Sequence, residues 1–248
     1  MDFLLVPFRV AYKIYFSFCF GFFLILFFPV FRYYLSEPKR YPKAFIGMRC
    51  FAWLLNILAL IKIKTEGKNN IPEKGSYIIC PNHSSFIDIP CLYIIFKKYF
   101  VFTGKKEIEN WPLFHIFYTS GMNILVDRKF GNGSFKAIKR MAEVIDKGFP
   151  LVIFPEGTIS KQAPRLTSFK PGAFSIAIQK QVPVLPVTFL TNWKLLQRGS
   201  FFGGKARPGL SRVIIHEPIS TLNLKKTDAT LLENMVREKI QEPLKKYI

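Results

Sequence analysis

Short apolar runs alternate with segments of helical periodicity from Thr65 onward, and this alternation limits the fold more than any other feature of the chain. The most regular segment begins at Ser134, carries apolar residues at helical spacing and stops at Gly148, just before the apolar run 151–154. Serine is a favoured N-cap, and glycine favours the position after a helix. Because a strand, a helix and a second strand in this order form a parallel unit, the pattern predicts an α/β fold.

The same pattern places the other elements of a mostly parallel sheet with helical crossovers. Strands are expected at 76–81, 99–104, 122–126, 151–154, 182–189 and 212–216. Helices are expected at 85–97, 134–148, 172–181 and 229–246, with the last helix basic, amphipathic and frayed at Pro243. Gly131-Asn132-Gly133 lacks the lysine and the spacing of a P-loop, so we predict a turn there. Residues 65–248 therefore form one predicted α/β domain.

A long apolar segment precedes this domain. Residues 14–31 contain no charge and many phenylalanines, and eighteen residues is about the shortest length that crosses a bilayer. A cleaved signal peptide would have a shorter apolar region followed by small residues. A second apolar segment, 50–61, is too short to span and fits an interfacial or re-entrant helix. Because basic residues flank both ends of the first segment, we expect residues 1–64 to form a helical hairpin inserted into one leaflet.

The charge balance indicates an anionic partner. The chain has 36 Lys and Arg against 16 Asp and Glu, a formal net charge of +20 over 248 residues. Such an excess is typical of proteins that bind nucleic acid or an anionic membrane surface, although a solvated basic face is a simpler explanation. Aromatic residues cluster in the apolar segments instead of alternating with basic residues, which disfavours nucleic acid. We therefore expect an anionic membrane surface as a partner, and no nucleic acid.

The four cysteines favour neither a disulfide framework nor a metal site. Cys19 and Cys50 lie in the apolar segments, so buried and reduced thiols are expected. Cys80, His83 and Cys91 could be imagined as zinc ligands, but no second group of Cys or His has ligand spacing. We expect neither a metal nor a cofactor.

One polar motif follows the predicted strand 76–81. In N-H-S-S-F-I-D, residues 82–88, a carboxylate comes five residues after a histidine. A histidine with one ring nitrogen held by a carboxylate has a fixed tautomer, so its other nitrogen can accept a proton from a substrate hydroxyl. Ser84 or Ser85 is expected to cap the next helix, with Asp88 in its first turn and free amides available to an anion. A helix-capping histidine is the alternative, because this spacing is common by chance.

A second motif, F-P-E-G-T, follows the predicted strand 151–154. Proline and glycine fix a tight turn around Glu156, and a carboxylate just after a buried strand is costly unless it has a partner or a ligand. A salt bridge within the turn is the simpler explanation. His83, Arg128 and Glu156 each follow the carboxyl end of a predicted strand, so we expect one site at this edge of the sheet. No G-x-S-x-G sequence occurs, which disfavours a serine hydrolase.

Together these motifs resemble the lysophosphatidic acid acyltransferase family of membrane glycerolipid acyltransferases, whose first motif is N-H-x4-D and whose third is F-P-E-G-T. Four blocks match in order and cover roughly residues 75–190. The blocks are 82–88, 121–128 (GMNILVDR), 154–158 and 182–187 (VPVLPV), with a further match at 104–107 (GKKE). The two N-terminal membrane-inserted helices of the family are also similar to the predicted hairpin.

The resemblance implies an enzyme that transfers a fatty acyl group from a thioester, either acyl-CoA or acyl carrier protein, to lysophosphatidic acid and gives phosphatidic acid. It implies His83 as the general base and Asp88 as the carboxylate that orients it. It also implies that Lys105 and Arg128 bind the acceptor phosphate. The other implied substrate-binding residues lie in or near the third motif, and they are Glu156, Gly157, Thr158 and Lys170. The implied location is the cytoplasmic face of the inner membrane.

One position departs from the pattern of the family. Members often carry arginine directly after F-P-E-G-T, whereas this chain has Ile159. A phosphate would lose one cation there unless Lys161, Arg165 or Lys170 replaces it. A lysophospholipid or an amino-acid-derived lysolipid is therefore an alternative acceptor. A basic peripheral membrane protein that binds anionic lipid without catalysis is the non-enzymatic alternative.

Overall fold

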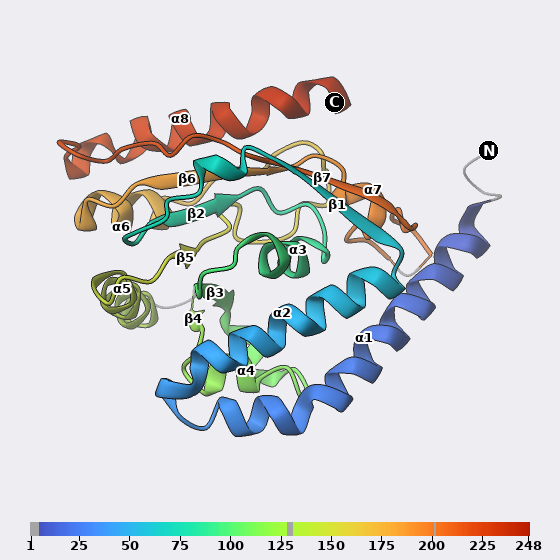
Figure 1. Ribbon diagram of the computed structural model, residues 1–248. Coiled ribbons are helices and arrows are strands. Elements are labelled where there is room, and N and C mark those ends of the chain that lie inside the picture. Colours follow the sequence, from blue (N-terminus) through green and yellow to red (C-terminus); the bar gives the residue numbers. More distant parts are fainter. Residues whose placement is uncertain (1–4, 128–130, 201) are drawn as a thin grey trace.

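A seven-stranded sheet forms the centre of the protein, which a computed structural model describes for residues 5–127, 131–200 and 202–248 (Figure 1). Its strand order is β1-β7-β6-β2-β5-β3-β4. All neighbouring strands run parallel except β6 and β7. The predicted α/β class with a mostly parallel sheet is confirmed. The strands are β1 (Ile61–Glu66), β2 (Ile78–Pro81), β3 (Val101–Lys105), β4 (Ile124–Val126), β5 (Leu151–Val152), β6 (Val184–Phe189) and β7 (Gly209–Ile215).

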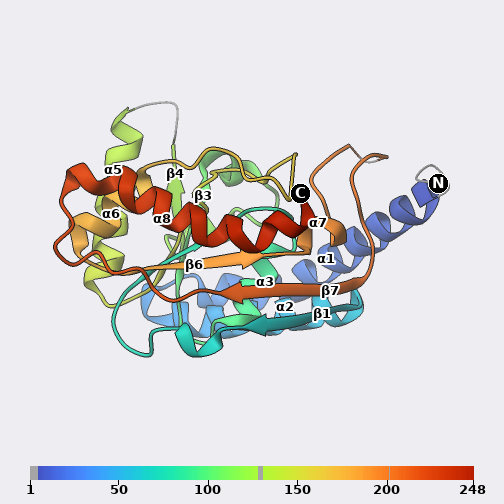
Figure 2. The same cartoon turned by 90° about the horizontal axis from the view of Figure 1, so that it is seen from above.

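Hydrophobic cores cover both faces of the sheet. Consecutive residues of a strand point to opposite faces, so Ile78 joins one core and Ile79 the other. The core with Ile79 contains buried residues of α1, α2 and α3, and the core with Ile78 contains those of α5, α6 and α8. In Figure 2, α8 lies over β6. The α-helices are α1 (Val6–Tyr34), α2 (Tyr41–Leu58), α3 (Asp88–Ile95), α4 (Ile116–Thr119), α5 (Gly131–Asp146), α6 (Gly172–Lys180), α7 (Asn192–Leu195) and α8 (Ala229–Gln241).

The predicted N-terminal helical hairpin is present. Helix α2 runs back along α1, and both helices lie against the same side of the domain (Figure 1). The ring of Phe31 in α1 makes edge-to-face contacts with Phe51 of α2 and with Phe117 of α4. Among the described residues, α1 is the one helix that is long and apolar enough to cross a membrane by length and composition.

The second predicted helix, expected at 50–61, has different boundaries in the structure. Helix α2 starts at Tyr41, with Pro42 in its first turn where a missing amide hydrogen costs nothing. It ends at Leu58, and Ile61 already belongs to β1, a strand that the sequence analysis missed. The division expected between residues 64 and 65 thus falls inside β1, which pairs with β7.

Three predicted helix boundaries also need correction. Helix α5 starts at Gly131, so Gly131-Asn132-Gly133 is helical and Ser134 is not an N-cap. The residues Ala137, Met141, Val144 and Ile145 bury one face of α5 in a core, which compensates for the poor helix propensity of glycine. Helix α3 starts at Asp88 instead of residue 85. Helix α8 ends at Gln241, and a 3-10 segment with Pro243 in its first turn follows it.

Gly104 in β3 leaves space for the ring of Tyr118. A Cβ atom at position 104 would lie 2.3 Å from Tyr118 Cε1. Because the buried ring cannot move away freely, we expect Gly104→Ala to lower the free energy of unfolding by about 1–3 kcal/mol. Urea denaturation measures this change, with Gly172→Ala as the matched control, since a Cβ at Gly172 would meet nothing within 4 Å. Equal urea midpoints for the two variants would contradict the steric argument.

His216 follows β7 and makes stability sensitive to pH. Its Nε2 lies 2.8 Å from Thr188 Oγ1, and burial lowers the pKa of His216 from 6.5 to about 4. The imidazole therefore binds a proton more readily in the unfolded chain than in the folded protein. Its contribution to the free energy of unfolding is fully present above pH 6.5 and is lost as the pH falls toward 4. We expect the urea midpoint of the wild type to fall more between pH 7 and pH 5 than that of His216→Gln. Equal losses in both proteins would exclude His216 as the cause.

Candidate active site

The two polar motifs meet at one edge of the sheet, as predicted. Strands β2 and β5 are parallel neighbours, so the segments that follow them leave the sheet on the same side. The imidazole of His83 stacks on the ring of Phe154, with 3.9 Å between the ring centroids and 23° between the planes. The main-chain N–H of His83 donates to Glu156 of the F-P-E-G-T motif, the third motif of the family, and its C=O accepts from Ser160, two residues after that motif.

His83 and Asp88 form a hydrogen-bonded pair with 2.9 Å between Nδ1 and Oδ2. Asp88 is fully buried at 0% exposure, and His83 is 9% exposed. An ionised carboxylate can only accept hydrogen bonds, so Nδ1 is the donor and Nε2 carries the free lone pair. The described part of the chain offers Nε2 no hydrogen-bond partner. This geometry suits a general base.

The carboxylate of Asp88, and not a serine, organises the first motif. Its Oδ2 accepts hydrogen bonds from the backbone amides of Ser84 and Ser85 at 2.7 and 2.9 Å. The prediction that one of these serines caps α3 is wrong, because Ile87 is the N-cap residue and no side chain caps it. The backbone amides of Ser84 and Ser85, which were expected to be available to an anion, thus donate to Asp88 instead.

Asn192 completes the surroundings of Asp88 and was missed by the sequence analysis. It lies in α7, just after β6, and is fully buried. Its Nδ2 donates to Asp88 Oδ1 at 2.8 Å, and its Oδ1 accepts from the hydroxyl of Ser211 at 2.6 Å. Both oxygens of the buried carboxylate therefore have donors, which stabilises its charged form. A polar residue just after an entirely buried strand was the one signal that could have indicated Asn192.

Glu156 holds the main chain of His83 in place. Its Oε1 accepts from the His83 amide at 2.8 Å, and its Oε2 accepts from the amide and the hydroxyl of Thr167 at 2.9 and 2.8 Å. Ser160 N–H donates to the carbonyl of His83 at 2.8 Å. Burial raises the pKa of Glu156, and the hydrogen bonds from His83 and Thr167 oppose that shift. The partners of the carboxylate are thus protein groups, and a direct contact between Glu156 and substrate stays a prediction.

The other predicted substrate-binding residues lie at different places. Gly157 adopts a φ of 70°, which the turn of the third motif requires. Thr158, the next residue, is exposed. Lys105 at the end of β3 pairs with Glu107 at 2.9 Å, and the exposed Lys170 donates its backbone N–H to the carbonyl of Pro155 at 2.8 Å. Arg128 lies outside the described residues.

A cation reaches the third motif from an unpredicted position. Arg198 Nη1 donates to the hydroxyl of Thr158 and, at 3.2 Å, to the carbonyl of Ile159. Lys161, Arg165 and Lys170 were the expected replacements, and no side chain of theirs forms such a bond with the motif in the described structure. Arg198 was missed because it lies in the loop between α7 and β7, 39 residues after Ile159.

The cysteines make no disulfide, and all four thiols are free. Cys19, Cys80 and Cys91 are buried, whereas Cys50 is exposed, so the expectation of buried thiols is wrong for Cys50. Burial raises the pKa of Cys91 to about 12, which makes this thiol a poor nucleophile. Within residues 5–127, 131–200 and 202–248, no three His, Cys, Asp or Glu side chains form a group that could hold a metal ion.

Comparisons with known proteins agree with the fold and the motifs. The Acyltransferase family model matches residues 62–190. The chloroplastic 1-acyl-sn-glycerol-3-phosphate acyltransferase LPAT1 of Arabidopsis thaliana is 34% identical over 77% of this chain and 51% of its own length. The 1-acyl-sn-glycerol-3-phosphate acyltransferase of Saccharomyces cerevisiae is 30% identical over 84% of this chain and 68% of its own length. The crystal structure of the LPA acyltransferase PlsC from Thermotoga maritima has a TM-score of 0.79 at 21% identity and covers 96% of this chain and 95% of its own.

The PlsC structure shares the overall fold of this chain. In this chain, a histidine held by a carboxylate lies at the carboxyl edge of the mostly parallel sheet. The chain belongs to the Acyltransferase family. It spans about half the length of the chloroplastic relatives, 51% and 58% of the Arabidopsis thaliana and Brassica napus proteins.

Proposed function

We propose that the protein transfers a fatty acyl group from a thioester to the free hydroxyl of lysophosphatidic acid and so forms phosphatidic acid. The observation that carries this proposal is the 2.9 Å contact between His83 Nδ1 and Asp88 Oδ2, which leaves Nε2 as the base. The names of relatives from plants, yeast and bacteria support the acceptor, since all are called 1-acyl-sn-glycerol-3-phosphate acyltransferase. Acyl-CoA and acyl carrier protein are the two thioesters proposed as donors.

The proposed mechanism is a direct transfer. His83 Nε2 takes the proton of the acceptor hydroxyl while the hydroxyl oxygen attacks the thioester carbonyl. The new ester forms when the carbon–sulfur bond breaks, and the leaving thiolate takes up the proton from His83. Asp88 stabilises the imidazolium that exists between these steps. Proton transfer of this kind contributes on the order of 10²–10⁴-fold to the rate. No protein nucleophile is required, and the hydroxyls of Ser84 and Ser85 bond to Asp88 and to the carbonyl of Leu196.

We further propose that the hairpin holds the protein on the cytoplasmic face of the inner membrane. One side of α1 is committed to the domain through Phe31, so the helix lies along a leaflet instead of crossing it. The opposite side exposes large apolar side chains that a leaflet would cover. The net charge of +20 would add attraction to anionic lipid. The exposed residues of α1 and α2 include Phe8, Ile14, Phe18, Phe22, Ile25, Leu26, Ile46, Trp53 and Ile57.

The test is thioester consumption by the purified protein in anionic micelles, with lysophosphatidic acid, lysophospholipids and a lyso-aminolipid offered separately. Each acceptor is assayed with acyl-CoA and with acyl carrier protein thioesters. Preferential use of lysophosphatidic acid is expected. Preference for another lysolipid would keep acyl transfer and change the acceptor. Lipid binding without thioester consumption would instead favour a non-catalytic membrane protein.

A further inference from the structure

The loop between α7 and β7 borders a hollow that the mechanism above does not use. Its volume is about 600 Å³, and it is lined by Lys161, Gln197, Arg198, Gly199, Ser200 and Gly204. None of these six described residues carries a carboxylate, whereas two carry a positive charge. Glycine and serine add hydroxyl and backbone donors without filling the space. The hollow therefore suits a small anionic group.

Two separate sets of contacts connect one wall of the hollow to the segment that carries His83. Arg198 bonds to Thr158 of the third motif and to Ile159, and the next residue, Ser160, donates its amide hydrogen to the carbonyl of His83 at 2.8 Å. On the other side, the hydroxyl of Ser85 donates to the carbonyl of Leu196 at 2.7 Å. The segment 196–198 is thus fastened to both catalytic motifs. A group held by Arg198 therefore lies beside the segments that contact His83 and Ser85.

Arg198 has donors left for a ligand. The third motif uses only Nη1, and the structure as described gives no partner to Nε or Nη2. A guanidinium held in this way keeps a rigid fork of donors, and such a fork matches the paired oxygens of a phosphate. Lys161, which lines the same hollow, has no ion pair in the described residues. The two cations can therefore bind one phosphate group.

We propose that this hollow binds the phosphate of the acceptor, with Arg198 as the residue that selects a phosphate-bearing lysolipid and Lys161 as the second cation. The inference rests on the proposed function and deepens it. In lysophosphatidic acid, the carbon that bears the phosphate is adjacent to the carbon that bears the free hydroxyl, so the phosphate must bind close to His83. The phosphates of a coenzyme A thioester are separated from its carbonyl by the whole pantetheine arm. Arg198 thus supplies the cation that Ile159 does not.

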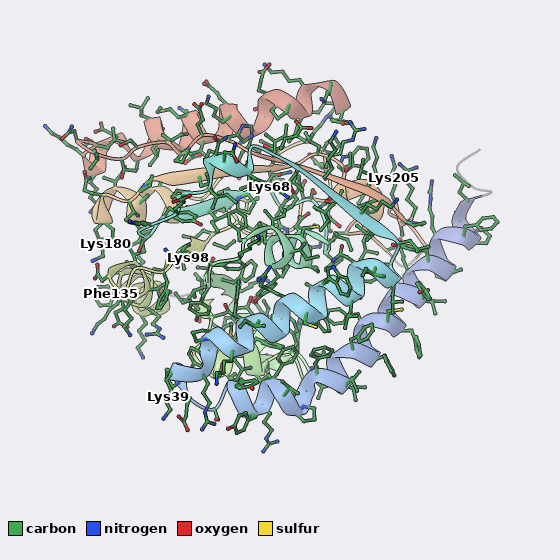
Figure 3. All side chains as sticks on the ribbon, viewed as in Figure 1. Lys39, Lys68, Lys98, Phe135, Lys180 and Lys205 are labelled. Atoms are coloured by element: carbon green, nitrogen blue, oxygen red, sulfur yellow. The ribbon has the colours of Figure 1, made fainter. Side chains whose placement is uncertain are left out.

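The test compares KM values for both substrates in wild type and Arg198→Ala. We expect the KM for lysophosphatidic acid to rise about 10- to 100-fold, because a charge-assisted hydrogen-bond pair is lost, while kcat and the KM for the thioester change little. Lys68→Ala is the matched control for loss of one charge. Lys68 follows β1, which runs antiparallel to β2, so Lys68 lies at the end of the sheet opposite to His83. Figure 3 shows Lys68 well apart from Lys205 of the α7–β7 loop.

Arg198 also bonds to the turn of the third motif, so two further readouts separate binding from a structural role. Monoacylglycerol, an acceptor without phosphate, should be used equally well by wild type and Arg198→Ala. Adding Ile159→Arg to the Arg198→Ala variant should recover the KM for lysophosphatidic acid, because the cation then comes from the motif itself. A structural defect would impair both acceptors and would not be rescued.

The outcomes distinguish the two proposals. Wild-type protein that does not acylate lysophosphatidic acid overturns the proposed function and the phosphate subsite together. Active wild-type protein with an unchanged KM in Arg198→Ala overturns the subsite alone. A rise confined to the KM for the coenzyme A thioester also overturns it, because the phosphate bound would then be that of the donor.

Discussion

Replacing His83 with alanine is expected to lower kcat by about 10²–10⁴-fold, because the general base is lost. Among the described residues, neither nearby carboxylate can replace the imidazole as the base, because Asp88 is fully buried and Glu156 accepts three hydrogen bonds from the protein. The fold should persist. Asp88 keeps the two backbone amides and Asn192 as donors after the ring is removed, so no unpaired buried charge is created.

Turnover of a labelled thioester measures the loss, and thermal unfolding shows that the variant is folded. His115→Ala is the matched control. His115 precedes α4 and is half-buried, and in the described part of the chain its ring has one polar contact, a long one of 3.4 Å to Thr119 Oγ1. Its loss should leave kcat unchanged. Full activity in His83→Ala would remove the general base from the mechanism and with it the main support for acyl transfer.

The parts of the fold that depend on local pattern were predictable. Buried strands such as β6 and amphipathic helices such as α6 carry their own periodicity and were placed within about two residues of their observed ends. Strand β1 was missed for the opposite reason. Its Ile-Lys-Ile-Lys sequence is a half-exposed edge strand, and the residues that pair with it, in β7, come more than a hundred positions later. A strand of this kind is defined by its partner more than by its own residues.

In the site too, contacts between residues close in sequence were predictable, and contacts between distant segments were not. His83 and Asp88 are five residues apart on one loop, so their pairing could be predicted from spacing. Asn192 lies 104 residues after Asp88 and meets it only because β6 and β2 are neighbours. The partners of Glu156 are largely backbone amides, whose positions depend on the path of the chain and not on residue type. A carboxylate in a tight turn indicated that a partner exists without indicating which one.

Asp88→Asn is expected to lower kcat by about 10³–10⁴-fold, similar to the loss when the carboxylate of a Ser-His-Asp triad is replaced by an amide. Asp88 Oδ2 faces three donors, and Oδ1 faces the amide of Asn192. An asparagine side chain has one acceptor oxygen and one NH₂ group with two N–H donors. Whichever way it turns, its NH₂ group meets at least one N–H donor, and the imidazolium loses the negative charge beside it. The mismatch should also lower the free energy of unfolding by about 1–3 kcal/mol.

The pair Asp88 and Asn192 allows these two effects to be separated. In the double variant Asp88→Asn with Asn192→Asp, the new carboxylate accepts from the asparagine NH₂, so the hydrogen bonds match again while the charge moves away from the imidazole. We expect the urea midpoint to recover and kcat to stay low, because the ring needs an adjacent charge. Asp146→Asn, which removes an exposed carboxylate paired with Lys180 at 2.6 Å, is the control and should change neither quantity. Recovery of kcat together with stability would show that Asp88 acts only by hydrogen bonding, and that its charge does not contribute to stabilising the imidazolium.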